Sequence, residues 1–157
     1  MRLEYFQLID RIVDLNLAGR TISSEAIVPT ESTIFEGHFP GYPLMPGVLL
    51  IEAMAQTSGW LIVAMNAFKR MPFLAAVKEA KLRTFVIPGQ KLIVDVSLDH
   101  DGSGYAMTKA KIKCAGNLIC DATLTLRVLD FPNPAMENEM RKIATKIGLN
   151  VEARTDG

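Results

Sequence analysis

The feature that most constrains the fold is a long apolar run from Val48 to Phe68. It approaches the length of a membrane-spanning helix. Polar residues and a glycine interrupt it: Glu52, Gln56, Thr57, Ser58, Gly59 and Asn66. A carboxylate in the middle of a helix is costly in lipid, and the sequence has no second segment of this kind. A helix that is apolar on nearly all sides is otherwise a buried one. We therefore expect a central helix enclosed by the rest of the chain and no membrane span.

The segments around this run predict a sheet. Several alternate between apolar and polar residues, which is the pattern of half-buried strands. Strands are expected over residues 21–28, 73–86, 90–99, 105–113 and 119–128. The charged stretch 78–81 should break the second of these, and residues 99–104 have the composition of a hairpin turn. The first fifteen residues are ambiguous, and we favour a short helical turn that leads into a strand. The sequence thus predicts an α+β fold, with a curved antiparallel sheet wrapped around the central helix.

The chain of 157 residues is most economically organised as one domain with an added C-terminal helix. We expect the domain over 1–131 and the helix over 132–149, packed on the domain or on a dimer. An apolar stripe and Gly148 as a C-cap support this helix. Residues 150–157 are expected to form a flexible tail.

Charge and cysteine content narrow the possible partners. The 17 basic and 17 acidic side chains cancel, so no overall field recruits nucleic acid or an anionic membrane. The cysteines, Cys114 and Cys120, have neither metal-site nor disulfide-framework spacing. The N-terminus lacks a basic leader followed by an apolar core. These features favour a cytoplasmic location.

The entry to the central helix is suited to binding a carbonyl oxygen. It begins with Pro46-Gly47, where proline replaces an N–H that would lack a partner and glycine lets another group approach the backbone. The exposed amides of Gly47 and Val48, reinforced by the helix dipole, could therefore hold an oxygen that gains negative charge.

Two ionisable residues flank this entry. His38 lies in a loop stiffened by proline, and Glu52 lies about one and a half turns into the helix. An unpaired carboxylate among apolar residues is penalised, so we expect Gln56, four residues on, to hold it by a hydrogen bond. A base, an acid and a carbonyl-polarising site are what the elimination of water from a 3-hydroxyacyl thioester requires. No metal or cofactor is needed.

Three motifs carry a resemblance to a known family: His-Phe-Pro-Gly at 38–41, Pro-Leu-Met-Pro-Gly-Val-Leu at 43–49 and Glu-Ala-Met-Ala-Gln at 52–56. Together they resemble the active-site signature of the 3-hydroxyacyl-acyl carrier protein dehydratases, which have the hot-dog fold, and the similarity runs from about Ile9 to Val128. It implies that His38 removes the C2 proton, that Glu52 handles the departing hydroxyl, and that the Gly47 amide helps to form the oxyanion hole.

The same resemblance implies a hydro-lyase that acts on an acyl carrier protein substrate in fatty-acid synthesis. It also implies a homodimer or a trimer of dimers, because in the family the two side chains come from different subunits. A glutamate at position 52 implies dehydration without isomerisation. The C-terminal helix resembles that of an alphaproteobacterial branch that serves very-long-chain acyl groups of lipid A.

Further residues are candidates for binding the substrate. Phe39, Met54 and Phe73 are candidates for the acyl tunnel. The basic residues Lys78, Lys81 and Arg83 could receive an acidic carrier protein. The sequence does not specify the preferred acyl chain length. It also does not specify whether the acyl group is attached to a carrier protein or to coenzyme A.

Two other functions fit parts of the pattern. A hot-dog acyl thioesterase shares the helix entry but needs a carboxylate with a water and has little use for the histidine. A non-catalytic subunit that binds acyl thioesters would keep the pocket, but the intact pair of His38 and Glu52 counts against it.

Overall fold

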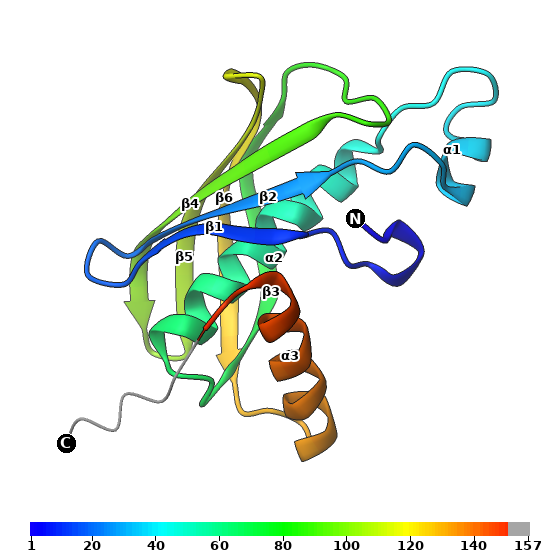
Figure 1. Cartoon of the computed structure of the whole chain (residues 1–157). Coiled ribbons are helices and arrows are strands. Elements are labelled where there is room, and N and C mark those ends of the chain that lie inside the picture. Colours follow the sequence, from blue (N-terminus) through cyan, green and yellow to red (C-terminus); the bar gives the residue numbers. More distant parts are fainter. Residues whose placement is uncertain (151–157) are drawn as a thin grey trace.

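A computed structural model describes residues 1–150 of the chain, in which an antiparallel sheet wraps around helix α2 (Gly47–Met65) (Figure 1). The strands are β1 (Arg11–Asn16), β2 (Thr21–Ile27), β3 (Met71–Leu82), β4 (Lys91–Gly102), β5 (Tyr105–Cys114) and β6 (Asn117–Leu129). They form a six-stranded sheet in the order β1-β2-β4-β5-β6-β3. This is the predicted architecture, and it leaves β1 and β3 as the edge strands.

Helix α2 is the core helix that its apolar sequence predicts. It is long and apolar enough to cross a membrane, but 67% of its most apolar window is buried inside the protein. Two of the polar residues that interrupt it, Thr57 and Ser58, bond to the sheet. The Thr57 hydroxyl lies 2.7 Å from that of Ser24 on β2, and the Ser58 hydroxyl lies 2.8 Å from that of Thr108 on β5. These buried hydroxyl pairs satisfy groups that would otherwise be costly to bury.

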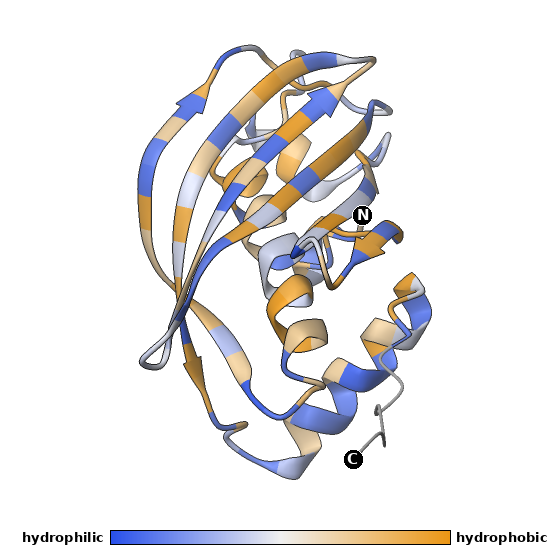
Figure 2. Cartoon of the chain, turned by 90° about the vertical axis from the view of Figure 1, so that its left-hand side faces the viewer, coloured by the Kyte–Doolittle hydropathy of each residue, from blue (hydrophilic) through white to orange (hydrophobic). Residues whose placement is uncertain are grey.

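Strands β2, β4, β5 and β6 alternate between buried and more exposed residues, as expected. Hydrophobic and hydrophilic colours alternate along the strands of the sheet (Figure 2). On β4, Leu92, Val94, Val96 and Leu98 are all buried. The predicted turn over 99–104 is too long. Strand β4 continues to Gly102 through an irregularity after Leu98, and only Ser103 and Gly104, both with positive φ, make the turn. Composition alone misses this because the polar residues at the end of β4 still pair with β5.

Strand β3 is irregular where its charged stretch predicted a break. Its register to β6 shifts between Leu74 and Ala76 and again between Lys78 and Lys81, but the strand continues to Leu82. Residues 83–86, expected to be strand, lie beyond its end. The stiff loop before α2 contains a short helix that was not predicted, α1 (Thr33–Gly37), which begins where the Ser32 hydroxyl accepts a hydrogen bond from the Ile34 amide.

Helix α3 (Pro134–Ile147) confirms the predicted C-terminal helix, with Gly148 in the left-handed conformation as its C-cap. It lies below β1, which it contacts, on the side of α2 that faces away from the sheet (Figure 1). Ala144 and Ile147 are buried there. Most of the expected flexible tail, 151–157, lies outside the described residues.

Candidate active site

His38 lies at the C-terminal end of α1, in a tight loop that holds its ring. The loop is closed by two hydrogen bonds between the backbones of Phe39 and Tyr42 and by one from the Leu44 amide to the His38 carbonyl. The peptide bond after His38 is cis. The ring Nδ1 lies 2.9 Å from the Leu44 carbonyl oxygen. Because a carbonyl can only accept, Nδ1 carries the proton of the neutral ring, and Nε2 keeps a lone pair that can accept one.

The N-terminus of α2 lies beside this histidine. His38 and Gly47 both line a cavity of about 610 Å³, which we call the His38 cavity and which β3 and the loop after it complete. Pro46 is the N-cap and supplies no side-chain hydrogen bond, so the first amides of the helix point out of its end. The Leu82 side chain lies so close to Gly47 that a Cβ there would clash with it. Glycine therefore lets the Leu82 side chain approach the backbone at this end of the helix.

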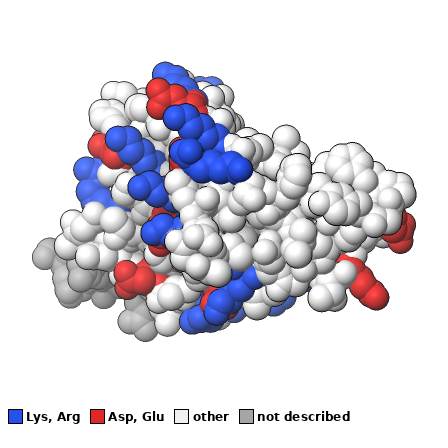
Figure 3. Space-filling view, turned by 90° about the horizontal axis from the view of Figure 1, so that it is seen from above, with Lys and Arg blue, Asp and Glu red and all other residues white. Residues whose placement is uncertain are grey.

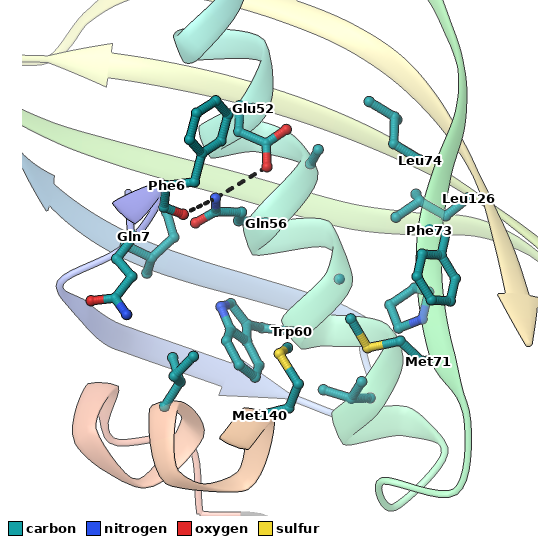
Figure 4. A pocket seen from close by; sticks show the side chains of 16 residues that line it. Phe6, Gln7, Glu52, Gln56, Trp60, Met71, Phe73, Leu74, Leu126 and Met140 are labelled. Atoms are coloured by element: carbon teal, nitrogen blue, oxygen red, sulfur yellow. Dashed lines mark hydrogen bonds between the residues drawn. The ribbon is translucent and has the colours of Figure 1, made fainter. Parts of the chain in front are cut away.

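Glu52 is held by Gln56, one turn further along α2. The Gln56 Nε2 donates to Glu52 Oε1 at 3.1 Å and to the Phe6 carbonyl at 2.6 Å (Figure 4). The Gln56 Oε1 accepts from the Leu8 amide at 3.1 Å. The carboxylate is thus oriented by an amide that is itself fixed on both sides by the N-terminal segment, residues 1–10. The expected hydrogen bond is present, and the contribution of the N-terminal segment was not foreseen.

Glu52 lines a second cavity, of about 320 Å³, which we call the Glu52 cavity. It runs along α2 between β3 and the N-terminal segment and reaches α3 (Figure 4). Apart from Glu52, Gln56 and Gln7, its lining side chains are apolar and include Trp60 and Met140. A cavity with one polar end and an otherwise apolar wall suits a ligand with a reactive head and an aliphatic tail.

Within one chain, the two candidate catalytic groups lie in different cavities. The His38 cavity does not include Glu52, and the Glu52 cavity does not include His38. Neither of these two cavities, as residues 1–150 form them, therefore holds both the imidazole and the carboxylate of one protomer.

The other predicted site residues are divided between these places. Phe73 lines the Glu52 cavity, whereas Phe39 stacks on the His38 ring, with centroids 4.1 Å apart, and lines the His38 cavity. Met54 is fully buried and lines neither cavity. Arg83 lines the His38 cavity and pairs with Asp121 at 2.6 Å. Lys78 and Lys81 are exposed on β3. The structure thus brings Arg83, but not these two lysines, to the wall of a cavity.

The surface is unevenly charged. Seen from above, Lys and Arg gather with Asp and Glu on one half of the molecule, and the half toward α1 carries few charges (Figure 3). Large exposed apolar side chains include Phe39, Tyr42, Val48, Leu82 and Phe85. Three of them, Phe39, Leu82 and Phe85, also line the His38 cavity.

Comparison with known proteins identifies a family whose members are similar to this chain in sequence. Residues 2–123 match the model of a FabA-like domain. The chain is 33% identical, over 128 residues, to the 3-hydroxyacyl-acyl-carrier-protein dehydratase FabZ of Listeria welshimeri; the match covers 81% of this chain and 88% of that enzyme.

Solved structures share the fold at lower identity. A dehydratase heterocomplex, ApeI:P, from Xenorhabdus doucetiae gives a TM-score of 0.64 at 16% identity and covers 87% of this chain and 90% of that one. A hypothetical thioesterase with coenzyme A from Streptococcus pneumoniae gives 0.61 at 14% identity and covers 78% and 88%. The architecture thus occurs in proteins named for dehydration and for thioester hydrolysis.

Proposed function

Because this chain belongs to the FabA-like family, we propose that it dehydrates a 3-hydroxyacyl thioester to the trans-2-enoyl thioester. The main support for this proposal is the hydrogen bond between His38 Nδ1 and the Leu44 carbonyl. It leaves Nε2 as a base in the cavity that Gly47 also lines. Relatives named as dehydratases of acyl carrier protein substrates support that class of thioester.

The chemistry follows from the positions of these groups. His38 Nε2 takes the proton from C2, and the electron pair moves toward the thioester carbonyl, whose oxygen is held by the Gly47 and Val48 amides. The C3–O bond then breaks, and the departing hydroxyl takes a proton from the Glu52 carboxyl group and leaves as water. The proton that His38 removed from C2 then returns through solvent to Glu52, so that both groups regain their starting states. Gln56 keeps the carboxyl group aimed at C3.

This reaction needs His38 and Glu52 at one thioester, and we infer that a homodimer brings them together. Strand β3 supports this inference because, within residues 1–150, it is a long edge strand that pairs on one side only. It also has exposed apolar side chains, Leu74 and Val77. Such edges pair with another chain unless they are protected. In this arrangement, His38 of one protomer meets Glu52 of its partner.

The finer assignments are also proposals. Arg83, with the exposed Lys78 and Lys81, would receive the acidic surface of a carrier protein near the His38 cavity. Supply of acyl chains for lipid A, assembly into a trimer of dimers and a cytoplasmic location stay predictions from the sequence.

The test is a dehydration assay with subunit mixing. Purified protein is incubated with a 3-hydroxyacyl carrier protein, and absorbance of the enoyl thioester is followed. His38→Ala and Glu52→Gln should each lack activity. Random mixing of the two variants should restore about a quarter of the wild-type activity, because half of the dimers are mixed and each has one intact site.

Other outcomes would overturn the proposal. Undiminished turnover by His38→Ala would remove the histidine from the mechanism. Release of free thiol without the enoyl product would favour the thioesterase alternative. Activity of the wild type without any recovery on mixing would contradict a site shared between protomers.

A further inference from the structure

We propose that helix α3 is the end wall of the acyl-chain cavity and that Met140, against Trp60, limits the length of acyl chain that the enzyme accepts. This inference rests on the proposed function, because it assigns the Glu52 cavity to the aliphatic tail of the same substrate. It gives the C-terminal helix a role in substrate selection.

The Glu52 cavity runs from the reactive end toward α3. Trp60 lies eight residues after Glu52 on α2, which corresponds to roughly 12 Å along a helix. Near Trp60 the cavity is lined by Met140 of α3 (Figure 4), and Ile143 of the same helix also belongs to its lining. Figure 4 places Met140 beside the Trp60 indole, at the end of the cavity away from Glu52. A tail whose C3 lies at Glu52 and which follows α2 therefore meets α3.

Helix α3 is anchored firmly enough to act as a wall. Its start is capped by Asn133, whose side chain accepts a hydrogen bond from the Met136 amide at 2.8 Å. The Arg141 guanidinium lies over the Phe68 ring, 4.7 Å from its centroid, and that ring stacks on Phe131 at 6.5 Å. The position of Met140 is thus set by contacts on both sides of it along the chain.

The wall comes from a part of the chain that the family match does not cover. The match ends at residue 123, before α3 begins at Pro134. The reactive end of the cavity is built from matched residues, whereas its far end depends on this added helix. Methionine fills irregular space and adopts several shapes, so replacing Met140 should change the depth of the cavity with little change at Glu52.

The experiment measures kcat/KM for straight-chain 3-hydroxyacyl carrier proteins, from short to very long, with the full chain. Met140→Ala should change kcat/KM least for the shortest substrates, whose tails end before Met140. It should favour chains longer than the wild-type optimum by up to roughly fourfold for each added methylene that becomes buried. Met140→Trp should shift the optimum to shorter chains. Asn138→Ala, an exposed position on the same helix, should keep the wild-type profile.

The two proposals fail in different ways. If no chain length is dehydrated by the wild type, the proposed function is wrong. If the wild type is active and both Met140 variants change kcat/KM by the same factor at every chain length, α3 is only structural and this inference is wrong. Because Met140→Ala and Met140→Trp should shift the optimum in opposite directions, a loss of folding by one variant leaves the other as the test.

Discussion

At the scale of single residues, Gln56 connects the candidate acid to the backbone of the N-terminal segment. Its amide bonds to Glu52, to the Phe6 carbonyl and to the Leu8 amide. The last two partners belong to a segment about fifty residues away in the sequence, so this side chain both orients the carboxylate and joins two parts of the fold. Removing the Gln56 side chain should therefore lower both the stability of the protein and its catalytic rate, each through a different hydrogen bond.

Replacing Gln56 by Met keeps the length of the side chain but removes its hydrogen bonds. We expect the free energy of unfolding to fall by about 1–3 kcal/mol, because the Leu8 amide and the Phe6 carbonyl lose their partner. We expect kcat to fall with little change in KM, because Glu52 is no longer aimed. Urea denaturation and steady-state kinetics measure the two effects.

A matched control for this variant is Gln90→Met. It also removes a hydrogen bond to a backbone amide, that of Ile87, but in a loop that lines neither described cavity. It should lower stability and leave kcat unchanged. An unchanged kcat in Gln56→Met would contradict a positioning role for Gln56.

The two cysteines should differ in reactivity. Burial, followed by the neighbouring Asp121 carboxylate, raises the pKa of the Cys120 thiol to about 11. Because the thiolate is the reactive form, Cys120 should stay unmodified by iodoacetamide at pH 8 in the native protein. The half-buried Cys114 should react first, and both should react in urea. Mass spectrometry of the alkylated peptides measures this order; modification of Cys120 before Cys114 would contradict it.

At the scale of elements, Glu4 attaches the N-terminal segment to the start of α1, which leads to His38. Its carboxylate accepts hydrogen bonds from the Ser32 hydroxyl at 2.6 Å and from the Thr33 amide at 3.0 Å. The Ser32 hydrogen bond is the largest of the causes that lower the pKa of Glu4 from 4.5 to about 2. A carboxyl group whose pKa is lowered by folding stabilises the protein above its unfolded pKa, and this contribution is lost as the pH falls through the folded one.

Glu4→Gln should therefore destabilise the protein at neutral pH. The difference from the wild type should shrink as the pH falls from about 4.5 and vanish below about pH 2. Urea midpoints measured across this range test it. Glu36→Gln, an exposed glutamate within α1 itself, is the matched control and should have a smaller effect. A Glu4→Gln difference that grows toward low pH would have the wrong sign.

The elements that sequence predicts well are those with a strong period. The alternation in β4, β5 and β6 and the apolar run of α2 reflect burial on one face or on all faces, and both were read correctly. Helix α1 was missed because its five residues are too few for a periodic signal and depend on a cap at Ser32. The end of β4 was missed because its last residues pair through the backbone, and backbone pairing leaves little trace in side-chain pattern.

The residues of the candidate site also differ in how well the sequence predicts them. His38, Glu52 and the helix entry are local in sequence, so their spacing is visible in the chain. The hydrogen bond from Gln56 to Glu52 is local too, at one helical turn. Other parts of the site come together only in the tertiary fold: the Phe6 carbonyl, the Leu8 amide and Met140. Residues of these types are common at purely structural positions, so the sequence does not mark them.

At the scale of the whole molecule, the sheet that residues 1–150 form has two edges, which should behave differently. Strand β1 is short and lies near the N-terminal segment, whereas β3 is 12 residues long and carries exposed Leu74 and Val77. The His38 and Glu52 cavities are both lined in part by residues of the β3 edge, either from β3 itself or from the loop after it. Pairing of two β3 strands would therefore place both cavities near the partner.

Val77→Lys tests this arrangement. It places a lysine beside Lys78 on each β3 strand, so pairing would bring like charges together in a position that should be apolar. We expect sedimentation equilibrium to show a shift toward monomer, and turnover at low protein concentration to fall at least about tenfold, which corresponds to a loss of about 1.4 kcal/mol in association. Raising the protein concentration should restore part of the turnover, because association recovers by mass action.

Val13→Lys on β1, where the valine is 46% exposed compared with 39% for Val77, should leave both assembly and turnover unchanged. A Val77→Lys protein that is monomeric yet fully active would mean that one protomer brings His38 and Glu52 together by itself.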